Sequence, residues 1–458
     1  MSAGSDQLPG TPRDVRHFGG NGVHTYRFIN AQGKSKFMKW YWLPKLDHRS
    51  LVYDEVRKIQ GKNNNFQRVD LYNNIEGGIY PEWEFAVQLF PDDGSYIYKG
   101  HDFLIPTVIV PFEVNPPMKL GKMILNRNLN NFFAEPESIS FAPSNVVDGV
   151  SFVPDPLLQW RLMSYDDTAT YRHNSPNGYT LPINRPIAPI NNNYRDDSIS
   201  TPNGIGGVRE PSANQTLAYT ASAGETAGNG PVGRHAAVYD WFGQARLFRG
   251  SLDSYAKRYA VDAYRFELGS AGNAAVVQNY TDCTLNKIDK CLARRVAYGV
   301  GATLPIIGSG LRTNLNNDTT PYPSLYPLDT SQEANKSNEG LAVAVVANDT
   351  VLTAPDLQAM MPLLSTQKVS LTVVAPRIGM LETGVMADTS LLTTSSVFYD
   401  ALSIGSSLSA NSSSRTGLDP DMLDFVMEAY GHGKGIAALG SSGSAVLKVI
   451  GIASESGV

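Results

Sequence analysis

The chain contains very little cysteine: Cys283 and Cys291 are the only two among 458 residues. They lie eight positions apart in a stretch with helical spacing. On one helix this separation is about 12 Å, whereas a disulfide needs Cα atoms within about 7 Å. The sequence therefore predicts no disulfide between them, and we expect both cysteines to be packing residues.

Long apolar runs and basic blocks are also scarce. No apolar stretch approaches the roughly 18 residues that span a membrane, and the start of the chain lacks the apolar core of a signal peptide. The 38 basic and 43 acidic residues give a formal net charge of −5, without a basic-aromatic stretch that could follow phosphates. These absences argue against a membrane or a nucleic acid as a partner, and they leave the compartment unassigned.

Alternating aromatic and polar residues predict an antiparallel sheet near the start of the chain. The stretches with this pattern are 22–30, 35–43 and 82–90. In the third stretch we expect the apolar residues at alternate positions from Trp83 to Leu89 to face the core, with Gln88 on the polar side. Helical spacing that ends in glycine predicts helices over 50–62 and 66–78.

Later segments change in character. Helical spacing returns over 252–269 and 273–301, and the chain after Gly340 alternates between apolar strands and helices. The expected strands there are 341–346, 369–375, 400–404 and 435–440, with helices over 355–364 and 419–434. Strands that alternate with helices imply a doubly wound parallel sheet.

The predicted fold class is α+β: an antiparallel β-barrel remnant with a wrapping arm and a helical region, followed by a doubly wound α/β domain. Asn, Pro, Ser, Thr and Gly dominate 186–233, which favours a long wrapping loop. The expected segments are 1–185 for the barrel part, 186–238 for the arm, 239–305 for the helical region, 306–340 for a linker and 341–458 for the α/β domain.

The stretch RLMSYDDTATYR, residues 161–172, places charge beside a phenol. At helical spacing Arg161, Tyr165 and Arg172 share one face, so two permanent cations can flank one phenol oxygen. Ionising a free tyrosine near neutrality costs about 4 kcal/mol unless positive charge offsets that cost. One interpretation is a site that stabilises a phenolate, and the other is an ordinary amphipathic helix with an arginine over a tyrosine.

The C-terminal domain carries a Gly/Ser loop over 438–446, at the end of an expected strand, where doubly wound sheets bind ligands. The loop has neither a GxGxxG nor a Walker pattern, and we interpret its serines as turn formers. His432 is the only histidine of this domain, and we expect it at an exposed helix end.

Several longer blocks resemble one family, the haem catalases. The blocks occur in the family's order and spacing, and they are GVHTYRFINAQGKSKF, PEWEFAVQLF, GKMILNRNLNNFFAEPESISF, DPLLQWRLMSYDDTATYR, LPINRP and NNNYRDD. The C-terminal domain, with QARLFRGSLDSY and VDAYRFELG before it, resembles the flavodoxin-like domain of the large-subunit branch. The resemblance extends over nearly the whole chain.

This resemblance implies a haem cofactor whose iron is bound by Tyr165, since the tyrosine-ligated haem is characteristic of catalases. Arg161 matches the arginine that keeps the tyrosine ionised. The other positions that match residues lining the haem or its edge are Arg172, Ser164, Thr168, Phe141, Leu157, Val23 and His24. For His24, a buried histidine of the barrel is the alternative interpretation.

Departures from the family pattern concern the catalytic side of the haem. In the family, a portion before the GVHT strand carries the distal histidine and asparagine that act on peroxide. None of the seven histidines here stands in a similar context, so we expect no catalytic residue in this chain and a rate loss of about 10²- to 10⁴-fold. Trp160, Met163 and Ala169 replace the family's glycine, phenylalanine and glutamine, and Trp160 is expected to overpack its helix.

The resemblance implies dismutation of hydrogen peroxide to water and oxygen, by a homo-oligomer that is a tetramer in the family and is cytoplasmic or secreted. Two alternatives stay open: a catalytically impaired pseudoenzyme, and a catalase-like haem protein that oxidises an organic substrate. Open strand edges also predict that the chain alone associates or is poorly soluble.

Overall fold

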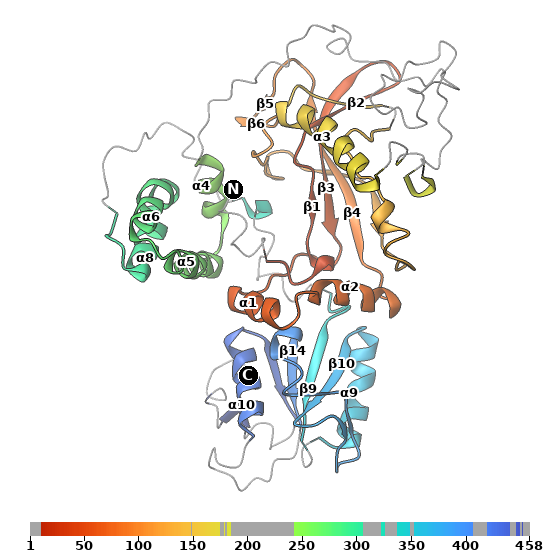
Figure 1. The fold of residues 1–458 in the computed structure, drawn as a ribbon, viewed down its shortest axis with the longest axis vertical. Coiled ribbons are helices and arrows are strands. Elements are labelled where there is room, and N and C mark those ends of the chain that lie inside the picture. Colours follow the sequence, from red (N-terminus) through yellow and green to blue (C-terminus); the bar gives the residue numbers. More distant parts are fainter. Residues whose placement is uncertain are drawn as a thin grey trace.

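The computed structural model describes residues 11–147, 149–174, 178, 181–184, 242–305, 322–325, 337–348, 352–405, 419–439, 446–448 and 451. Figure 1 shows three groups of elements: an antiparallel sheet crossed by one long helix, a cluster of helices beside it, and a parallel sheet with its own helices. The expected arm over 186–238 lies outside the described residues. Across the described ranges, no helix has the length and apolar character needed to cross a bilayer.

The N-terminal half forms a six-stranded sheet in the order β7-β4-β3-β2-β8, with β1 beside β3. Every pair in it is antiparallel, as the sequence predicts. The strands are β1 (Gly20–Asn21), β2 (Tyr26–Ile29), β3 (Ser35–Pro44), β4 (Glu82–Pro91), β7 (Met118–Ile124) and β8 (Val150–Ser151). Between β4 and β7 lies a short hairpin of β5 (Ile97–Tyr98) and β6 (His101–Asp102).

The helices α1 (Tyr53–Lys62) and α2 (Phe66–Glu76) follow β3, as the glycine-terminated helical spacing predicts. The sidedness predicted for β4 is only partly confirmed. Trp83 and Val87 are buried as expected, but Gln88 on the other side is also fully buried, as are Ala86 and Phe90. A buried amide must have its hydrogen bonds satisfied.

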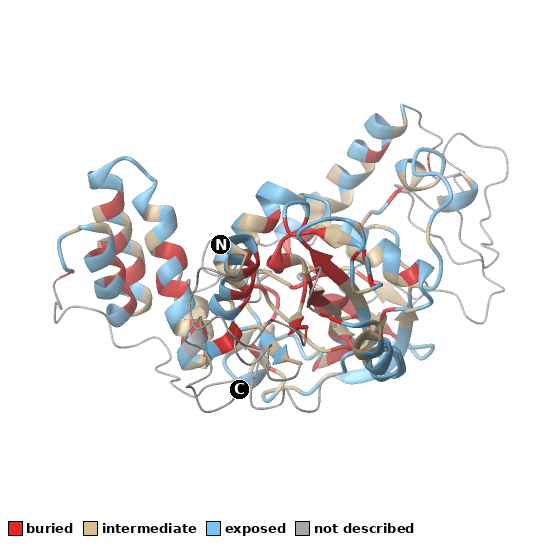
Figure 2. Ribbon diagram, turned by 90° about the horizontal axis from the view of Figure 1, so that it is seen from below, coloured by how far each residue is buried: buried red, intermediate tan, exposed pale blue. Residues whose placement is uncertain are grey.

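Gln88 meets this requirement in the core. It accepts a hydrogen bond from the Tyr41 hydroxyl at 2.7 Å and donates to the carbonyl oxygens of Val110 at 3.0 Å and Asn115 at 2.6 Å. The polar residue therefore ties the sheet to the loop that covers it. Figure 2 shows the buried residues gathered on the strands and on the inner sides of the helices.

The helical region contains α4 (Gly243–Ser251), α5 (Ser254–Gly269), α6 (Ala274–Tyr280), α7 (Asn286–Ile288) and α8 (Lys290–Val300), with a π-helical turn over Thr281–Leu285. The helical structure predicted over 273–301 is therefore present, but it is interrupted at Asp289. The chain becomes extended at Asp289, whose carboxylate accepts from the amides of Cys291 and Leu292 and so starts α8 afresh. Cys283 and Cys291 are both exposed, so the prediction that they are packing residues is wrong.

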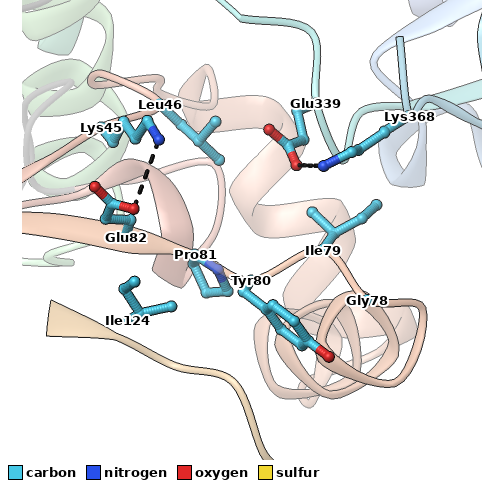
Figure 3. Close-up of a pocket in the computed structure, with 10 residues that line it drawn as sticks. All are labelled: Lys45, Leu46, Gly78, Ile79, Tyr80, Pro81, Glu82, Ile124, Glu339 and Lys368. Atoms are coloured by element: carbon cyan, nitrogen blue, oxygen red, sulfur yellow. Dashed lines mark hydrogen bonds and ion pairs between the residues drawn. The ribbon is translucent and has the colours of Figure 1, made fainter. Parts of the chain in front are cut away.

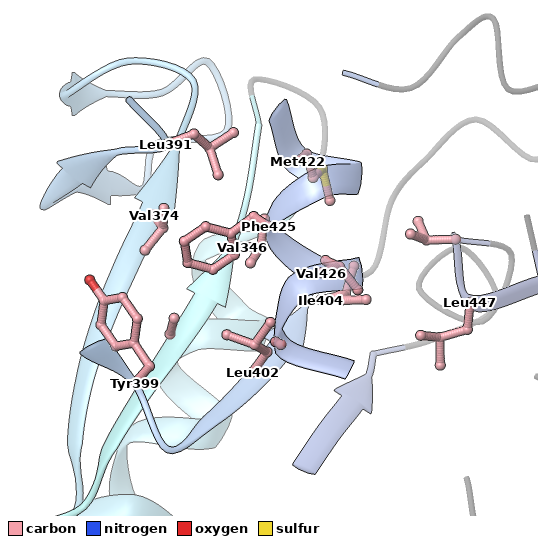
Figure 4. Packing of buried hydrophobic residues seen from close by; sticks show 13 residues of the cluster. Val346, Val374, Leu391, Tyr399, Leu402, Ile404, Met422, Phe425, Val426 and Leu447 are labelled. Carbon is pink, nitrogen blue, oxygen red and sulfur yellow. The ribbon is translucent and has the colours of Figure 1, made fainter. Parts of the chain in front are cut away.

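The C-terminal sheet has the order β13-β10-β9-β14-β15, and all of its pairs are parallel, as predicted. Its strands are β9 (Ala342–Val346), β10 (Ser370–Ala375), β13 (Thr389–Ser390), β14 (Ala401–Ile404) and β15 (Gly435–Ala438). The helices are α9 (Ala354–Thr366) and α10 (Pro420–Gly431), and a small hairpin joins β11 (Gly379–Met380) to β12 (Met386–Ala387). Figure 4 shows Phe425 and Val426 of α10 packed over Val346 and Leu402 of the sheet.

Buried ion pairs join the N-terminal segment to the C-terminal sheet. Arg13 donates to both carboxylate oxygens of Asp400, at 2.6 and 3.1 Å. Arg16 donates to both oxygens of Asp70 on α2 and to the carbonyl of Gly340 just before β9. Burial alone would raise the pKa of Asp400, but the Arg13 guanidinium and the Ala342 amide outweigh burial and lower it.

A second group of ion pairs joins α1 to the end of α10. Lys434 lies 2.9 Å from Glu55, with both side chains nearly inaccessible, and Lys58 lies 2.8 Å from Glu428. His432 caps the C-terminus of α10, as expected, but the expectation that it is exposed is wrong. Its side chain is 5% exposed, and its Nε2 lies 2.8 Å from the Asp54 carboxylate on α1.

We expect Asp400→Asn to lower the free energy of unfolding by about 3 kcal/mol, because it leaves the buried Arg13 charge without its counter-ion. The pKa of Asp400 is lowered in the folded state, so its contribution is complete above the unfolded pKa of about 4 and is lost as the pH falls through the folded value. Urea unfolding at neutral and acidic pH measures both effects. The free energies of unfolding of the wild type and of Asp400→Asn should become equal at acidic pH.

The exposed pair Lys368–Glu339 provides the control. It lies at a cavity of about 260 Å³ beside the first residue of β4 (Figure 3), and the two side chains are 58% and 32% exposed. Lys368→Met should cost less than about 1 kcal/mol. Equal losses in the two variants would contradict the role assigned to Arg13 and Asp400.

Candidate functional site

The helix α3 (Pro156–His173) carries most of the predicted site residues. It begins because Asp155 accepts a hydrogen bond from the Leu157 amide at 2.9 Å and Pro156 takes the first helical position. It ends at Asn174, which adopts the left-handed conformation that closes helices. The helix predicted around Arg161 is therefore present.

Arg161 and Tyr165 meet on one face of α3, as their spacing predicts. The Nη2 of Arg161 donates to the Tyr165 Oη at 2.6 Å, and the guanidinium carbon lies 5.0 Å from the centre of the phenol ring. Arg172 is exposed in the last turn of the helix, two turns beyond Tyr165. Among the described residues, Arg161 is thus the cation that contacts the phenol oxygen.

The other side of the Arg161 guanidinium is held by His24. The Nη1 of Arg161 lies 2.8 Å from His24 Nε2, and His24 Nδ1 lies 2.6 Å from the Asp155 Oδ2. Because an arginine can only donate, Nε2 must be the acceptor and the hydrogen of the neutral imidazole must lie on Nδ1. The hydrogen-bond chain therefore runs from Tyr165 through Arg161 and His24 to Asp155.

The inner end of this chain is buried. His24 and Asp155 are 5% and 2% exposed, whereas Tyr165 is 37% exposed. Two further titratable residues lie around it. Burial lowers the pKa of Lys39 to about 8, against the opposing charges of Asp155 and Asp102, and burial raises the pKa of Tyr26 to about 12. At neutral pH, Lys39 is therefore a buried cation and Tyr26 a neutral phenol.

The remaining predicted residues are mostly accessible. Val23, Leu157 and Phe141 are 47%, 46% and 78% exposed. Thr168 is exposed on α3, and its hydroxyl donates to the carbonyl of Ser164 at 2.8 Å. Hydrogen bonds connect Tyr165, Arg161 and His24, while Leu157, Ser164, Thr168 and Arg172 share their helix with Tyr165. Among the described residues, no hydrogen bond or ring contact joins the exposed Phe141 to Tyr165.

Trp160 does not overpack its helix. Its side chain is 65% exposed, and Met163 on the next turn is 62% exposed. A residue that reaches solvent has no packed neighbours to displace, so the strain predicted from sequence is wrong. Ala169 is buried on the opposite face of α3.

Sequence reasoning missed Asp155 and Lys39. Asp155 could have been found as a helix N-cap, because it directly precedes a proline at the start of a helical stretch. Its bond to His24 could not, since 131 positions separate the two residues. Lys39 carries no local signal that separates it from Lys36, the exposed lysine of the same strand.

Comparison with known proteins identifies the family of the chain. The family model for catalase matches residues 2–218, and the model for the C-terminal domain found in long catalases matches residues 339–458. The chain belongs to the catalase family. The second match places it with the long catalases, the branch that carries this additional domain.

Curated relatives extend the match across the chain. The chain is 37% identical to Catalase B of Aspergillus oryzae, 34% to Catalase-3 of Neurospora crassa and 33% to Catalase-2 of Bacillus subtilis. These matches cover 97%, 97% and 94% of this chain, but only 63%, 62% and 62% of the respective relatives. The chain thus spans about three fifths of the length of the curated relatives it matches.

We expect Asp155→Asn to break the hydrogen-bond chain even though asparagine is a good N-cap. The carboxylate serves two donors, the Leu157 amide and His24 Nδ1, whereas an amide has a single accepting oxygen. One bond must be lost, and stability should fall by about 1 to 3 kcal/mol. Urea unfolding measures the loss, and nitrogen chemical shifts of His24 report whether its hydrogen leaves Nδ1.

Asp253→Asn is the matched control. Asp253 caps α5 by accepting from the Ala256 amide at 2.7 Å, a bond that asparagine can also accept. Its substitution should change stability by less than about 0.5 kcal/mol. Equal losses at Asp155 and Asp253 would show that capping alone accounts for Asp155.

Proposed function

We propose that this chain contains the proximal haem-binding part of a catalase and acts in the dismutation of hydrogen peroxide to water and oxygen. The observation that carries the proposal is Tyr165, a partly exposed tyrosine whose phenol oxygen accepts a hydrogen bond from a guanidinium that is itself held in place. Family membership supplies the reaction. The geometry supports Tyr165 as the residue to which the cofactor would attach.

The residues present fit a haem. A ferric porphyrin needs an anionic axial ligand and an apolar surface for its rings. Tyr165 offers the oxygen, and Leu157 lies two turns earlier on α3 with nearly half of its side chain exposed. Phe141 and Val23 are further exposed apolar side chains at positions that match the family's haem contacts.

Each residue of the hydrogen-bond chain has a stated task in this proposal. Tyr165 would bind the iron through its phenolate oxygen. Arg161 stabilises that oxygen's negative charge and, being permanently protonated, does not take up the phenol proton. His24 and Asp155 fix the direction of the guanidinium. Haem, when bound, would supply the iron chemistry by which peroxide is both oxidised and reduced.

The proposal also includes the remaining predicted assignments. Ser164, Thr168 and Arg172 would line the haem on the same helix, and Val23 and His24 would lie near its edge. A homo-oligomer, with the 186–238 segment as a connecting arm, follows the family pattern. The segment boundaries 1–185, 239–305, 306–340 and 341–458 are likewise offered as the domain division of the chain.

A titration of the purified chain with haemin tests the proposal. We expect a Soret band with the features of tyrosine ligation in the wild type, and a loss of affinity of at least about tenfold in Tyr165→Phe. Tyr171→Phe is the matched control, because Tyr171 belongs to the same helix and is 81% exposed. Identical spectra for Tyr165→Phe and wild type would contradict the assignment of the ligand.

Oxygen release from hydrogen peroxide by the haem-loaded chain then separates the remaining interpretations. Release that depends on Tyr165 would support dismutation by this chain. Haem binding without oxygen release would favour the impaired pseudoenzyme. Oxidation of an added phenol at the expense of peroxide, without oxygen release, would favour the organic oxidase.

A further inference from the structure

A cavity of about 480 Å³ lies where α1, α5 and α10 approach one another (Figure 1). Its wall consists of the first turns of α1, one side of α5 and the end of α10. The volume falls within the range of about 300 to 1,000 Å³ that is typical of small-molecule sites. None of the lining residues belongs to the Tyr165 site, so the cavity is separate from the place proposed for haem.

Aromatic side chains form one side of the cavity. On α5, Tyr259 and Phe266 lie two turns apart on one face of the helix, and they are 37% and 48% exposed. Tyr53 of α1 contributes a third ring, whose centroid lies 5.4 Å from that of Phe266. Its hydroxyl donates to the Glu267 carboxylate, which fixes the direction of the ring. Partly exposed rings beside a cavity offer an apolar surface to a planar ligand.

Acidic side chains also line the cavity, but two of them are matched by a lysine. Asp54 lies 2.8 Å from both the Lys58 Nζ and the His432 Nε2, and Glu428 lies 2.8 Å from the same Lys58 Nζ. Burial alone would raise the pKa of each carboxyl, but the hydrogen bond from Lys58 outweighs burial and lowers it. These carboxylates are therefore charged and paired, which leaves little negative charge for a cationic ligand.

Arg57 differs from these groups because it has no acidic partner. Its guanidinium carbon lies 5.2 Å from the centre of the Phe266 ring, and its Nη1 makes a long hydrogen bond of 3.4 Å to the Gln60 amide oxygen. In the part of the chain that the structure describes, no ion pair joins Arg57 to a carboxylate. The remaining acidic residue of the wall, Asp262, lies 3.5 Å from Arg265. The cavity thus presents one unmatched cation beside its aromatic side.

We propose that this cavity binds a planar aromatic carboxylate, whose ring lies against Phe266 and Tyr259 and whose carboxylate accepts two hydrogen bonds from Arg57. A guanidinium donates to a carboxylate through two parallel N–H groups, and it is more weakly hydrated than an ammonium, so the pair forms with less loss of hydration. This binding site goes beyond the dismutation proposed above. The competing explanations are a cationic ligand, held by the acidic residues of the wall, and a seam between helices that binds nothing specifically.

Calorimetric titration of the full chain with 2-naphthoate tests the proposal. The ligand control is 2-naphthylmethylammonium, which has the same ring and the opposite charge. We expect 2-naphthoate to bind at least about tenfold more tightly than the ammonium compound, and its affinity to fall at least about tenfold in Arg57→Gln. Phe266→Leu removes one aromatic face and should weaken binding about fivefold. Arg68→Gln is the matched control variant, because Arg68 is exposed on α2 outside the cavity, and it should bind as the wild type does.

Circular dichroism establishes that each variant is folded. If Arg57→Gln does not fold, Arg57→Lys takes its place: it keeps the charge but loses the paired donors, so affinity should fall about threefold or more. A wild-type chain that shows no saturable binding of 2-naphthoate up to about 10 mM would overturn the proposal. So would tighter binding of the ammonium compound, or wild-type affinity in the folded Arg57 variant.

Two further measurements locate the bound ligand. Because the wall combines three helices, 2-naphthoate should raise the midpoint of thermal unfolding of the wild type, and it should raise that of Arg57→Gln much less. The affinity for 2-naphthoate should also be the same in the wild type and in Tyr165→Phe, with or without haemin. Loss of binding in Tyr165→Phe, or displacement of 2-naphthoate by haemin, would place the ligand at Tyr165 and overturn the assignment to this cavity. Since the titration needs no haem, its outcome does not depend on the proposed function.

Discussion

The carboxylate of Asp155 is the contact on which the Tyr165 site depends. One of its oxygens accepts from the Leu157 amide and starts α3, and the other accepts from the His24 ring. The same side chain therefore fixes where the helix begins and which way the imidazole points. Because Tyr165 and Arg161 belong to that helix, both halves of the phenol site are positioned from one buried group.

In the described part of the chain, buried charges form several junctions between segments far apart in the sequence. Asp155 joins α3 to the residues before β2, and Arg13 joins the N-terminal segment to Asp400 beside the parallel sheet. Charged groups lose hydration when buried, and only well-formed bonds compensate for this loss. Such contacts add little net stability, but a misplaced segment would leave a bare charge, so they strongly disfavour other arrangements.

Sequence reasoning recovers what depends on local spacing. The meeting of Arg161 with Tyr165 follows from four positions on a helix, and the antiparallel and parallel sheets follow from their periodicities. Sequence reasoning fails where the burial of a polar residue depends on a partner far away in the sequence. Gln88 can be buried because Tyr41 and two carbonyl groups satisfy its amide, and the nearly covered His432 side chain pairs with Asp54 on another helix. No pattern within either stretch encodes those partners.

An arginine one turn before a tyrosine is common on exposed helices, and this spacing alone does not fix the position of the guanidinium at the phenol oxygen. A free guanidinium samples many rotamers, and holding it at one oxygen costs conformational entropy. Here that cost is met before any ligand arrives, because Arg161 is bound on its second nitrogen by a histidine that is itself fixed by Asp155. A donor already directed at the phenol oxygen stabilises negative charge without reorganising, which is the electrostatic condition that an anionic ligand to iron requires. His24 and Asp155, at the buried end of the hydrogen-bond chain, therefore fix the arginine that can stabilise a negative charge on Tyr165 at the other end.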